Sequence, residues 1–323
     1  MKIAVVGCGA VGSFYGAKLC RAGHDVSFLL RSDLDRVRRD GVVVRSVDGD
    51  FQVRPRPASE PDGIGPCDLV LVALKTTANR EFSRLISPLV NSHTAILTLQ
   101  NGLGSDDALA ALFGPDRVLG GLCFVCLNRT APGVIQHLAH GRVVLGAYAA
   151  TPRPRTEDIA AAFIEAGVPA EVTSDLARAR WEKLVWNVPF NGLGVVGVVG
   201  RDHFLAGRLP PDFQPGPGLD TQALLASPDW EPLIRELMAE VVVAAQHLGH
   251  ALPPSIIEAN LERTRVMGAY RASTVLDFEA GRPLEIDSIF LEPRRRAHAA
   301  GVGTPRLDRV CELLALLDPE RAG

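Results

Sequence analysis

Three polar side chains at helical spacing mark the stretch of this chain that could do chemistry. Lys183, Asn187 and Asn191 recur at every fourth residue within an otherwise apolar run. In a helix they would line one face with neighbours about 6 Å apart, so we call them the polar stripe. Pro189 predicts a kink beside it, because an interior proline removes a backbone hydrogen bond. The alternative is that Lys183 is an ordinary exposed lysine, as most single lysines are.

A lysine on such a stripe could act as a proton donor, for example to a carbonyl that is being reduced. Hydride delivery to a carbonyl builds an alkoxide, and a lysine whose pKa is lowered by burial can donate the proton near neutral pH. This chemistry needs no metal. The eight histidines form no H-E-x-x-H or similar zinc motif, so the sequence predicts a site without a metal.

The chain begins with the pattern of a strand, a glycine turn and a helix. In order these are Lys2 to Val6, then Gly7-Cys8-Gly9-Ala10-Val11-Gly12, then residues 13 to 19, followed by a second strand at Val26 to Leu30. In this context G-x-G-x-x-G predicts dinucleotide binding by the whole turn, Cys8, Ala10 and Val11 included. Gly7 permits the tight turn, Gly9 lets the backbone approach a pyrophosphate, and Gly12 lets the helix pack closely.

The second strand ends where the residue that reads the cofactor's ribose is expected, about 20 residues past the glycines. The first polar residue there is Arg31, and Asp33 follows shortly after it. A guanidinium suits the 2′-phosphate of NADP, whereas an acidic residue would bind a free 2′-hydroxyl. Arg31 therefore favours NADPH, with a surface arginine at a strand end as the alternative.

Two further strands end in polar residues. Cys67 to Leu74 and Thr94 to Leu99 are nearly continuous apolar runs, as buried parallel strands are, and the residues after them are Lys75 and Gln100-Asn101-Gly102. Ligands of open α/β sheets bind at the carboxyl ends of the strands, so Lys75 and Asn101 are placed to touch a cofactor or substrate. A solvated lysine and a turn asparagine are the alternatives.

The β character of the sequence ends near residue 174. Asp48-Gly49 predicts a hairpin, and later strands are expected at Val118 to Asn128, Val134 to Leu138 and Arg142 to Ala147. These features predict an α/β N-terminal Rossmann-like dinucleotide-binding domain at 1–174, followed by an all-helical C-terminal domain at 175–323. The segment 201–220 is rich in proline and glycine and is expected to be an inserted loop.

Composition narrows the class of protein. A chain of 323 residues with 47% hydrophobic composition can bury a large core, and a net charge of −3 argues against a broad nucleic-acid-binding surface. The six cysteines have neither disulfide nor zinc spacing, and no apolar stretch reaches transmembrane length. We expect a cytoplasmic protein that binds neither nucleic acid nor membrane.

Together these motifs resemble the ketopantoate reductase (2-dehydropantoate 2-reductase) family over nearly the whole chain. The resemblance rests on the glycine turn, the strand end at Lys75, Gln100-Asn101-Gly102, the polar stripe, and Ser273 followed by Gly281-Arg282-Pro283-x-Glu285-Ile286-Asp287. It implies a cleft between the two domains in which NADPH reduces the ketone of a 2-oxo acid.

The resemblance also implies roles for single residues. Lys183 would be the general acid, and Glu285 would contact Lys183 or the substrate hydroxyl. The substrate would be held by Asn101, Asn187, Asn191 and Ser273. One departure is Gly192, which stands where the family usually has proline.

The leading hypothesis is NADPH-dependent reduction of 2-dehydropantoate (ketopantoate) to pantoate, on the pantothenate pathway. One alternative is a relative that reduces a different 2-oxo acid. Another is a non-catalytic NADP-binding sensor, because a Rossmann fold alone does not imply chemistry. A sensor would have no need of Lys183 together with Glu285. The expected partner is a small 2-oxo acid, and a homodimer is left open.

Overall fold

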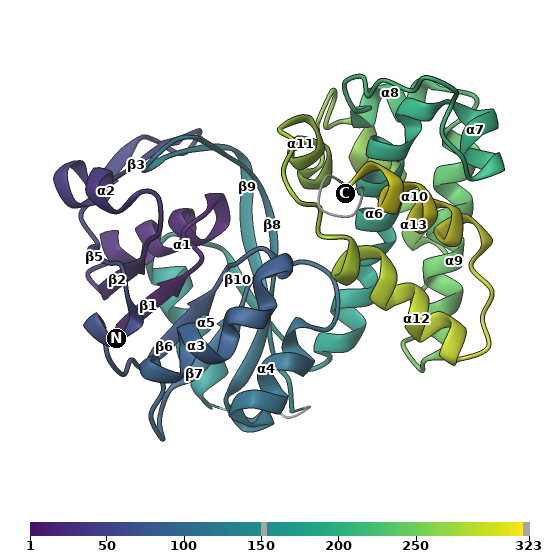
Figure 1. Cartoon of the computed structure of the whole chain (residues 1–323). Coiled ribbons are helices and arrows are strands. Elements are labelled where there is room, and N and C mark those ends of the chain that lie inside the picture. Colours follow the sequence, from purple (N-terminus) through teal and green to yellow (C-terminus); the bar gives the residue numbers. More distant parts are fainter. Residues whose placement is uncertain (150–153, 319–323) are drawn as a thin grey trace. The chain divides into compact units, whose positions relative to one another are not determined.

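The computed structural model describes residues 1–149 and 154–318, and the chain divides into two compact units, Met1–Leu176 (unit 1) and Ala177–Gly323 (unit 2) (Figure 1). In the described part of unit 1, ten strands form one sheet in the order β4-β3-β9-β8-β7-β6-β1-β2-β5, with β10 beside β9. The strands are β1 (Lys2–Val6), β2 (Asp25–Leu29), β3 (Val42–Ser46), β4 (Phe51–Val53), β5 (Arg56–Ala58), β6 (Leu69–Val72), β7 (Ala95–Thr98), β8 (Val118–Ala131), β9 (Val134–Ala147) and β10 (Ala170–Thr173).

The six neighbouring strands β8, β7, β6, β1, β2 and β5 are all parallel. Their carboxyl ends therefore lie along one edge of the sheet, where an open α/β sheet binds its ligand. β9 runs antiparallel to β8, and β3 and β4 form the hairpin predicted at Asp48-Gly49. The predicted Rossmann-like architecture is confirmed.

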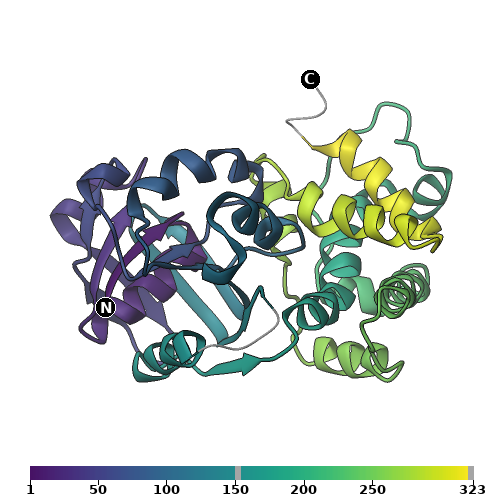
Figure 2. The same cartoon turned by 90° about the horizontal axis from the view of Figure 1, so that it is seen from below.

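Helices cover both faces of the sheet (Figures 1 and 2). They are α1 (Ala10–Arg21), α2 (Leu34–Asp40), α3 (Phe82–Ile86), α4 (Ser105–Phe113) and α5 (Pro154–Glu165). Alternate residues of β1 enter different core clusters: Ile3 and Val5 pack with residues of α1 and α5, whereas Ala4 and Val6 pack with residues of α3 and α4. This burial on both faces explains why the parallel strands read as continuous apolar runs.

The strands expected at Val134 to Leu138 and Arg142 to Ala147 are in fact one strand, β9. It pairs with β8 along nearly its whole length, with shifts of register after Phe124 and after Cys126. His140 adopts a φ of 65° in this irregular stretch. A bulge absorbs the extra residue and the ladder continues beyond it, so the predicted break is wrong.

The described part of unit 2 is helical, as predicted. Its helices are α6 (Leu176–Val196), α7 (Arg201–Ala206), α8 (Thr221–Ala226), α9 (Glu231–His247), α10 (Ile256–Arg265), α11 (Ser273–Glu279), the π-helical turn η6 (Asp287–Leu291), α12 (Glu292–Ala299) and α13 (Pro305–Leu317). The polar stripe lies on α6, which continues through Pro189 to Val196. The proline does not end the helix, and the kink expected beside the polar stripe stays a prediction.

Glycines let other elements approach α6 closely. A Cβ on Gly192 would lie 2.8 Å from Val310 of α13 and 3.1 Å from the ring of Phe290 in η6. A Cβ on Gly194 would lie 2.5 Å from Val275 of α11. The glycine found where the family usually has proline is thus a packing position between three elements of unit 2.

The segment 201–220 is irregular only in part. Its first residues form α7, where Phe204 is fully buried with its ring centroid 5.8 Å from that of Trp230. Near its other end Gly218 is buried, and its N–H donates to Glu279 (3.0 Å). The segment therefore has packed ends and a mostly exposed middle, in contrast to the loop expected throughout. That it is an insertion stays a prediction.

Candidate functional site

The turn after β1 has two positions at which only glycine fits. Gly7 has a φ of 101°, and a Cβ there would lie 2.3 Å from the backbone nitrogen of Leu74. A Cβ on Gly12 would lie 2.2 Å from the carbonyl oxygen of Gly7. The absence of both side chains lets the start of α1 pack against the ends of β1 and β6.

Gly9 differs, because a Cβ there would meet nothing within 4 Å. It is exposed and immediately precedes α1, whose first turn carries no acidic side chain. The first N–H groups of a helix have no partner within the helix, so this end favours an anion. Cys8, Ala10 and Val11 are half-buried around it. Open space over a glycine at a helix N-terminus fits a dinucleotide pyrophosphate.

The Cys8 side chain supports the turn. Its thiol donates to the carbonyl of Val5 (3.5 Å), and the Ser13 hydroxyl donates to the carbonyl of Cys8 (3.0 Å). Burial raises the pKa of the Cys8 thiol, and the nearby charge of Asp33 raises it further. A thiol that stays protonated is a poor nucleophile, so Cys8 is a structural member of the turn.

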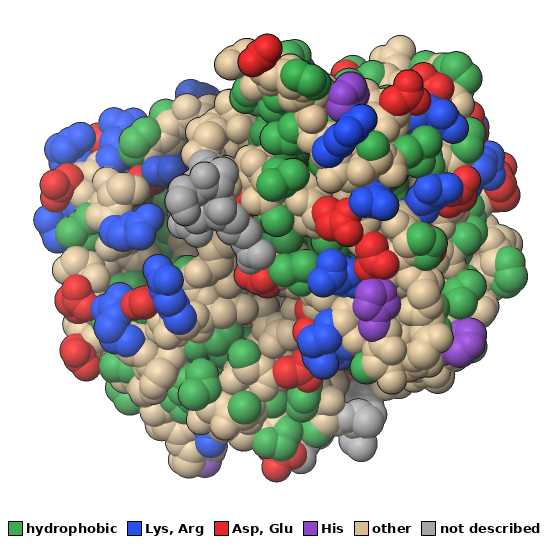
Figure 3. All heavy atoms as spheres, turned by 45° about the vertical axis from the view of Figure 1, so that its right-hand side comes forward, with side chains coloured by type: hydrophobic (Ala, Val, Ile, Leu, Met, Phe, Trp, Pro, Cys, Tyr) green, Lys and Arg blue, Asp and Glu red, His purple; other side chains and the backbone are tan. Residues whose placement is uncertain are grey.

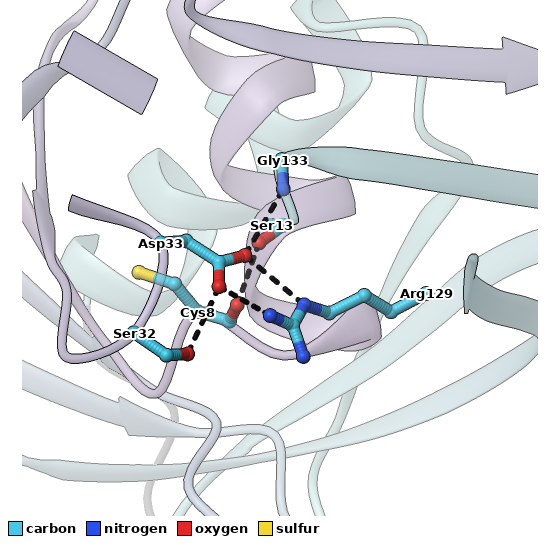
Figure 4. A network of polar contacts seen from close by, with 6 residues as sticks. All are labelled: Cys8, Ser13, Ser32, Asp33, Arg129 and Gly133. Atoms are coloured by element: carbon cyan, nitrogen blue, oxygen red, sulfur yellow. Dashed lines mark hydrogen bonds and ion pairs between the residues drawn. The ribbon is translucent and has the colours of Figure 1, made fainter. Parts of the chain in front are cut away.

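Asp33 is held by four hydrogen bonds from within unit 1 (Figure 4). Arg129 donates through Nε to Oδ2 (3.0 Å) and through Nη2 to Oδ1. The Gly133 N–H donates to Oδ2 (3.0 Å), and the Ser32 hydroxyl donates to Oδ1 (2.9 Å). Burial opposes ionisation, but these donors outweigh it and hold the pKa of Asp33 below its ordinary value of 3.8.

This network predicts how stability depends on pH. The pKa of Asp33 is lower folded than unfolded, so its contribution is complete above the unfolded value and is lost as pH falls through the folded value. We expect Asp33→Asn to lower the free energy of unfolding at neutral pH, and this deficit to shrink below about pH 4. Urea unfolding at several pH values measures it. A deficit that grows on acidification would mean that the pKa of Asp33 is raised in the folded protein.

Arg31 lies at the same strand end but is exposed, whereas Asp33 is buried. The acidic residue that could have competed for the ribose is thus engaged inside the protein. In the connection between β2 and α2, Arg31 is the first charged residue after β2, and its side chain is exposed. It favours a phosphate at this position over a free hydroxyl.

The strand ends at Lys75 and Asn101 are linked through Gln100. The Gln100 amide donates to the carbonyl of Leu74 (3.0 Å) and to Oδ1 of Asn79 (2.8 Å). The carboxyl ends of β6 and β7 are therefore tied together beside the glycine turn. Lys75 is exposed and Asn101 is half-buried on this same edge. The predicted cofactor residues of unit 1 thus share one edge of the sheet.

In unit 2 the polar stripe follows one face of α6, as its spacing predicts. Asn187 and Asn191 are buried, and Lys183 is half-buried. Glu285 is 5% exposed and precedes η6. Lys183 is therefore not the ordinary exposed lysine that the alternative required. The contact proposed between Lys183 and Glu285 stays a prediction.

Asn191 and Ser273, both expected to hold substrate, also contact each other. Oδ1 of Asn191 accepts from the Thr274 N–H (3.0 Å) and from the Ser273 hydroxyl (3.3 Å). These donors identify the oxygen of the Asn191 side chain, because an amide nitrogen cannot accept them. The carbonyl is thus committed to the start of α11, and the group that Asn191 can offer a ligand is its NH₂.

Residues 1–149 and 154–318 hold no cluster of side chains suited to a metal. Within these ranges no group of three or more His, Cys, Asp or Glu side chains could hold a metal ion. No helix there has the length and apolar character to cross a bilayer. On the face shown in Figure 3, basic and acidic side chains are interspersed.

Two family models match the chain. The model described as Ketopantoate reductase PanE/ApbA matches residues 3–150, and Ketopantoate reductase PanE/ApbA C terminal matches residues 218–318. The 2-dehydropantoate 2-reductase of Nostoc sp. is 38% identical, over 98% of this chain and 95% of its own. This chain belongs to the ketopantoate reductase family.

Solved structures of ketopantoate reductases share the fold. The crystal structure of 2-dehydropantoate 2-reductase from Geobacter metallireducens GS-15 has a TM-score of 0.89 and 42% identity, and covers 100% of both chains. The enzyme from Methylococcus capsulatus has a TM-score of 0.85 and 35% identity, with 100% of this chain and 98% of that chain covered. The predicted family and fold class are confirmed.

Arg129 is a residue that local sequence reasoning misses in this chain. It lies at the far end of β8, 96 residues beyond the Asp33 that it contacts. No motif links the two positions. One feature of the sequence could have indicated this contact. The apolar run that begins at Val118 is longer than β7, so the strand extends beyond the end of β7 to the edge of the sheet where β2 ends.

Proposed function

We propose that this protein reduces 2-dehydropantoate to pantoate with NADPH. The observation that carries the proposal is the turn from Gly7 to Gly12, with space above Gly9 at the N-terminus of α1, in a chain of the ketopantoate reductase family. The relatives named above carry this activity in their names. NADPH supplies the hydride when bound.

The residues of unit 1 would bind the cofactor. The first turn of α1 stabilises the pyrophosphate charge, and Arg31 pairs with the 2′-phosphate. Lys75 and Asn101, on the same edge of the sheet, would contact the cofactor, and Asn101 would also contact the substrate.

The residues of unit 2 would bind the substrate and move its proton. Lys183 donates a proton to the oxygen of the developing alkoxide, which removes charge as the C–H bond forms. Asn187 and Ser273 orient the 2-oxo acid, and the NH₂ of Asn191 donates to its carboxylate, since its carbonyl is engaged by Thr274. Glu285 holds or tunes Lys183.

An initial-rate panel of 2-oxo acids with NADPH tests the activity. We expect the highest kcat/KM with 2-dehydropantoate. A higher value for another 2-oxo acid would instead assign the protein to a relative with a different substrate. Binding of NADPH without turnover of any member of the panel would support the sensor.

Replacing Arg31 with alanine tests the cofactor. A charge-assisted contact is worth about 1.5–3 kcal/mol, so we expect NADPH to bind roughly 10- to 100-fold more weakly while NADH is almost unaffected. Titration calorimetry measures both constants. Arg39→Ala, which removes an exposed arginine from α2, should change neither. An equal loss for the two cofactors would show that Arg31 is structural.

We also infer a cytoplasmic location and a small-molecule partner. All six cysteines are free thiols in the structure, which suits a reducing compartment. A homodimer stays a prediction, to be checked by sedimentation of the purified chain.

A further inference from the structure

Asp33 lies near the position at which many dinucleotide-binding proteins bind the ribose with an acidic residue. Its carboxylate, however, already accepts hydrogen bonds from other groups of the protein. A carboxylate offers about four lone-pair sites. Here Arg129 donates two hydrogen bonds, and the Gly133 N–H and the Ser32 hydroxyl donate one each. With the side chain 6% exposed, the carboxylate is shielded from a ribose hydroxyl.

The donors that engage Asp33 come mostly from outside the dinucleotide motif. Arg129 lies at the end of β8, and Gly133 lies in the turn between β8 and β9 with a φ of 68°. The Gly133 carbonyl also accepts from the Val43 N–H (2.9 Å), which fixes this turn against β3. The hairpin, held to β3 by this hydrogen bond, thus places Arg129 against Asp33 beyond the end of β2 (Figure 4).

The charges at this strand end depend on Arg129. Of Arg31, Asp33 and Arg129, two are positive and one is negative, so the three side chains together carry one positive charge. Without Arg129 this net positive charge disappears, and Asp33 keeps only the hydrogen bonds from Gly133 and Ser32, so that its charge is uncompensated and it has acceptor sites to spare. That carboxylate would repel a 2′-phosphate and could accept a hydrogen bond from a 2′-hydroxyl.

We propose that Arg129 is a positioning residue for cofactor selectivity, which favours NADPH over NADH by neutralising and immobilising Asp33. This inference rests on the proposed function, in that the chain binds NADPH. Arg129 acts through Asp33, whereas Arg31 contacts the phosphate itself. The Asp33 charge also acts on the Cys8 thiol in the glycine turn, so the network and the pyrophosphate site share one electrostatic neighbourhood.

Arg129→Met tests the proposal through the ratio of two dissociation constants. We expect NADPH to bind about 10- to 100-fold more weakly, and NADH to bind as tightly as in the parent or more tightly. Adding Asp33→Asn to the same chain removes the uncompensated carboxylate and should restore NADPH binding to within a few-fold of the parent. A purely structural role would weaken both cofactors together, without this rescue.

Arg142→Met is the matched control, because it removes an arginine of β9 that pairs with Glu171 (3.0 Å). It should leave both dissociation constants unchanged. If Arg129→Met does not fold, Asp33→Asn alone carries the test. That variant keeps Arg129 and should bind NADPH at least as tightly as the parent, with no gain for NADH.

Two results would overturn the inference while the proposed function stands. One is a parent that binds NADPH and an Arg129→Met variant that weakens NADPH and NADH by the same factor. The other is an Asp33→Asn variant that loses NADPH affinity more than NADH affinity. A parent that binds neither cofactor would overturn the proposed function itself, and this inference with it.

Discussion

Lys183→Ala is expected to lower kcat by about 10²–10⁴-fold while NADPH still binds, because general acid catalysis contributes a factor of this size. The residue lies half-buried on α6, on the face that also presents the buried Asn187 and Asn191. A side chain in this setting has polar neighbours along the helix and a restricted environment, as a proton donor requires. Stopped-flow measurement of NADPH oxidation under single turnover reports the chemical step.

Two further variants separate proton donation from other effects. Lys183→Arg keeps the positive charge but cannot release a proton near neutral pH, so kcat should fall nearly as far as in Lys183→Ala while KM for the substrate is better preserved. Glu182→Ala changes the exposed neighbour on the same helix and should leave kcat unchanged. A folded Lys183→Ala variant that binds NADPH and reduces 2-dehydropantoate near the parent rate would remove Lys183 from the mechanism.

The sequence predicts those parts of the fold whose geometry is decided by residues close together in the chain. The strand, the glycine turn and α1 lie where the pattern places them, because the turn needs a positive φ at Gly7 and β1 needs burial on both faces. The polar stripe is likewise a matter of helical periodicity on α6. Local geometry of this kind is determined within a few residues.

The contacts that complete the candidate site join distant segments and carry no local signal. Asp33 and Arg129 are 96 residues apart, and Asn191 and Thr274 are 83 residues apart. Each pairing depends on sheet order or helix packing, which no short pattern specifies. The break predicted within β9 fails for the same reason, because cross-strand pairing with β8 outweighs the local preference of His140 and Gly141.

Helix α7 shows how composition misleads when packing decides the structure. Proline and glycine in 201–220 predict a loop, yet Phe204 is buried against Trp230 and a helical turn forms around it. Burial of one aromatic side chain stabilises structure by roughly 1.5–3 kcal/mol, which exceeds the local preferences of a short exposed segment. The residue roles in catalysis depend further on substrate and cofactor, and they stay predictions.

Gly12→Ala and Gly9→Ala are expected to fail in different ways, although both lie in the same turn. The added Cβ at Gly12 would lie 2.2 Å from the Gly7 carbonyl oxygen, which is backbone and cannot rotate away. Overpacking typically lowers the free energy of unfolding by roughly 1–3 kcal/mol, and we expect Gly12→Ala to lose about 3 kcal/mol or more. For a unit of the size of Met1–Leu176, a loss of about 3 kcal/mol lowers Tm by roughly 6–12 °C.

Gly9→Ala should instead leave Tm nearly unchanged, since its Cβ would meet nothing within 4 Å of the protein. The methyl group would occupy the space that the pyrophosphate needs and hold it away from the N–H groups of α1. Hydrogen bonds to a charged group are worth about 1.5–3 kcal/mol, so NADPH should bind roughly 10- to 100-fold more weakly. Thermal melts of the two variants measure the expected difference in Tm, and NADPH titrations measure the expected loss of affinity in Gly9→Ala. A Gly9→Ala variant that binds NADPH like the parent would place the pyrophosphate elsewhere than above Gly9.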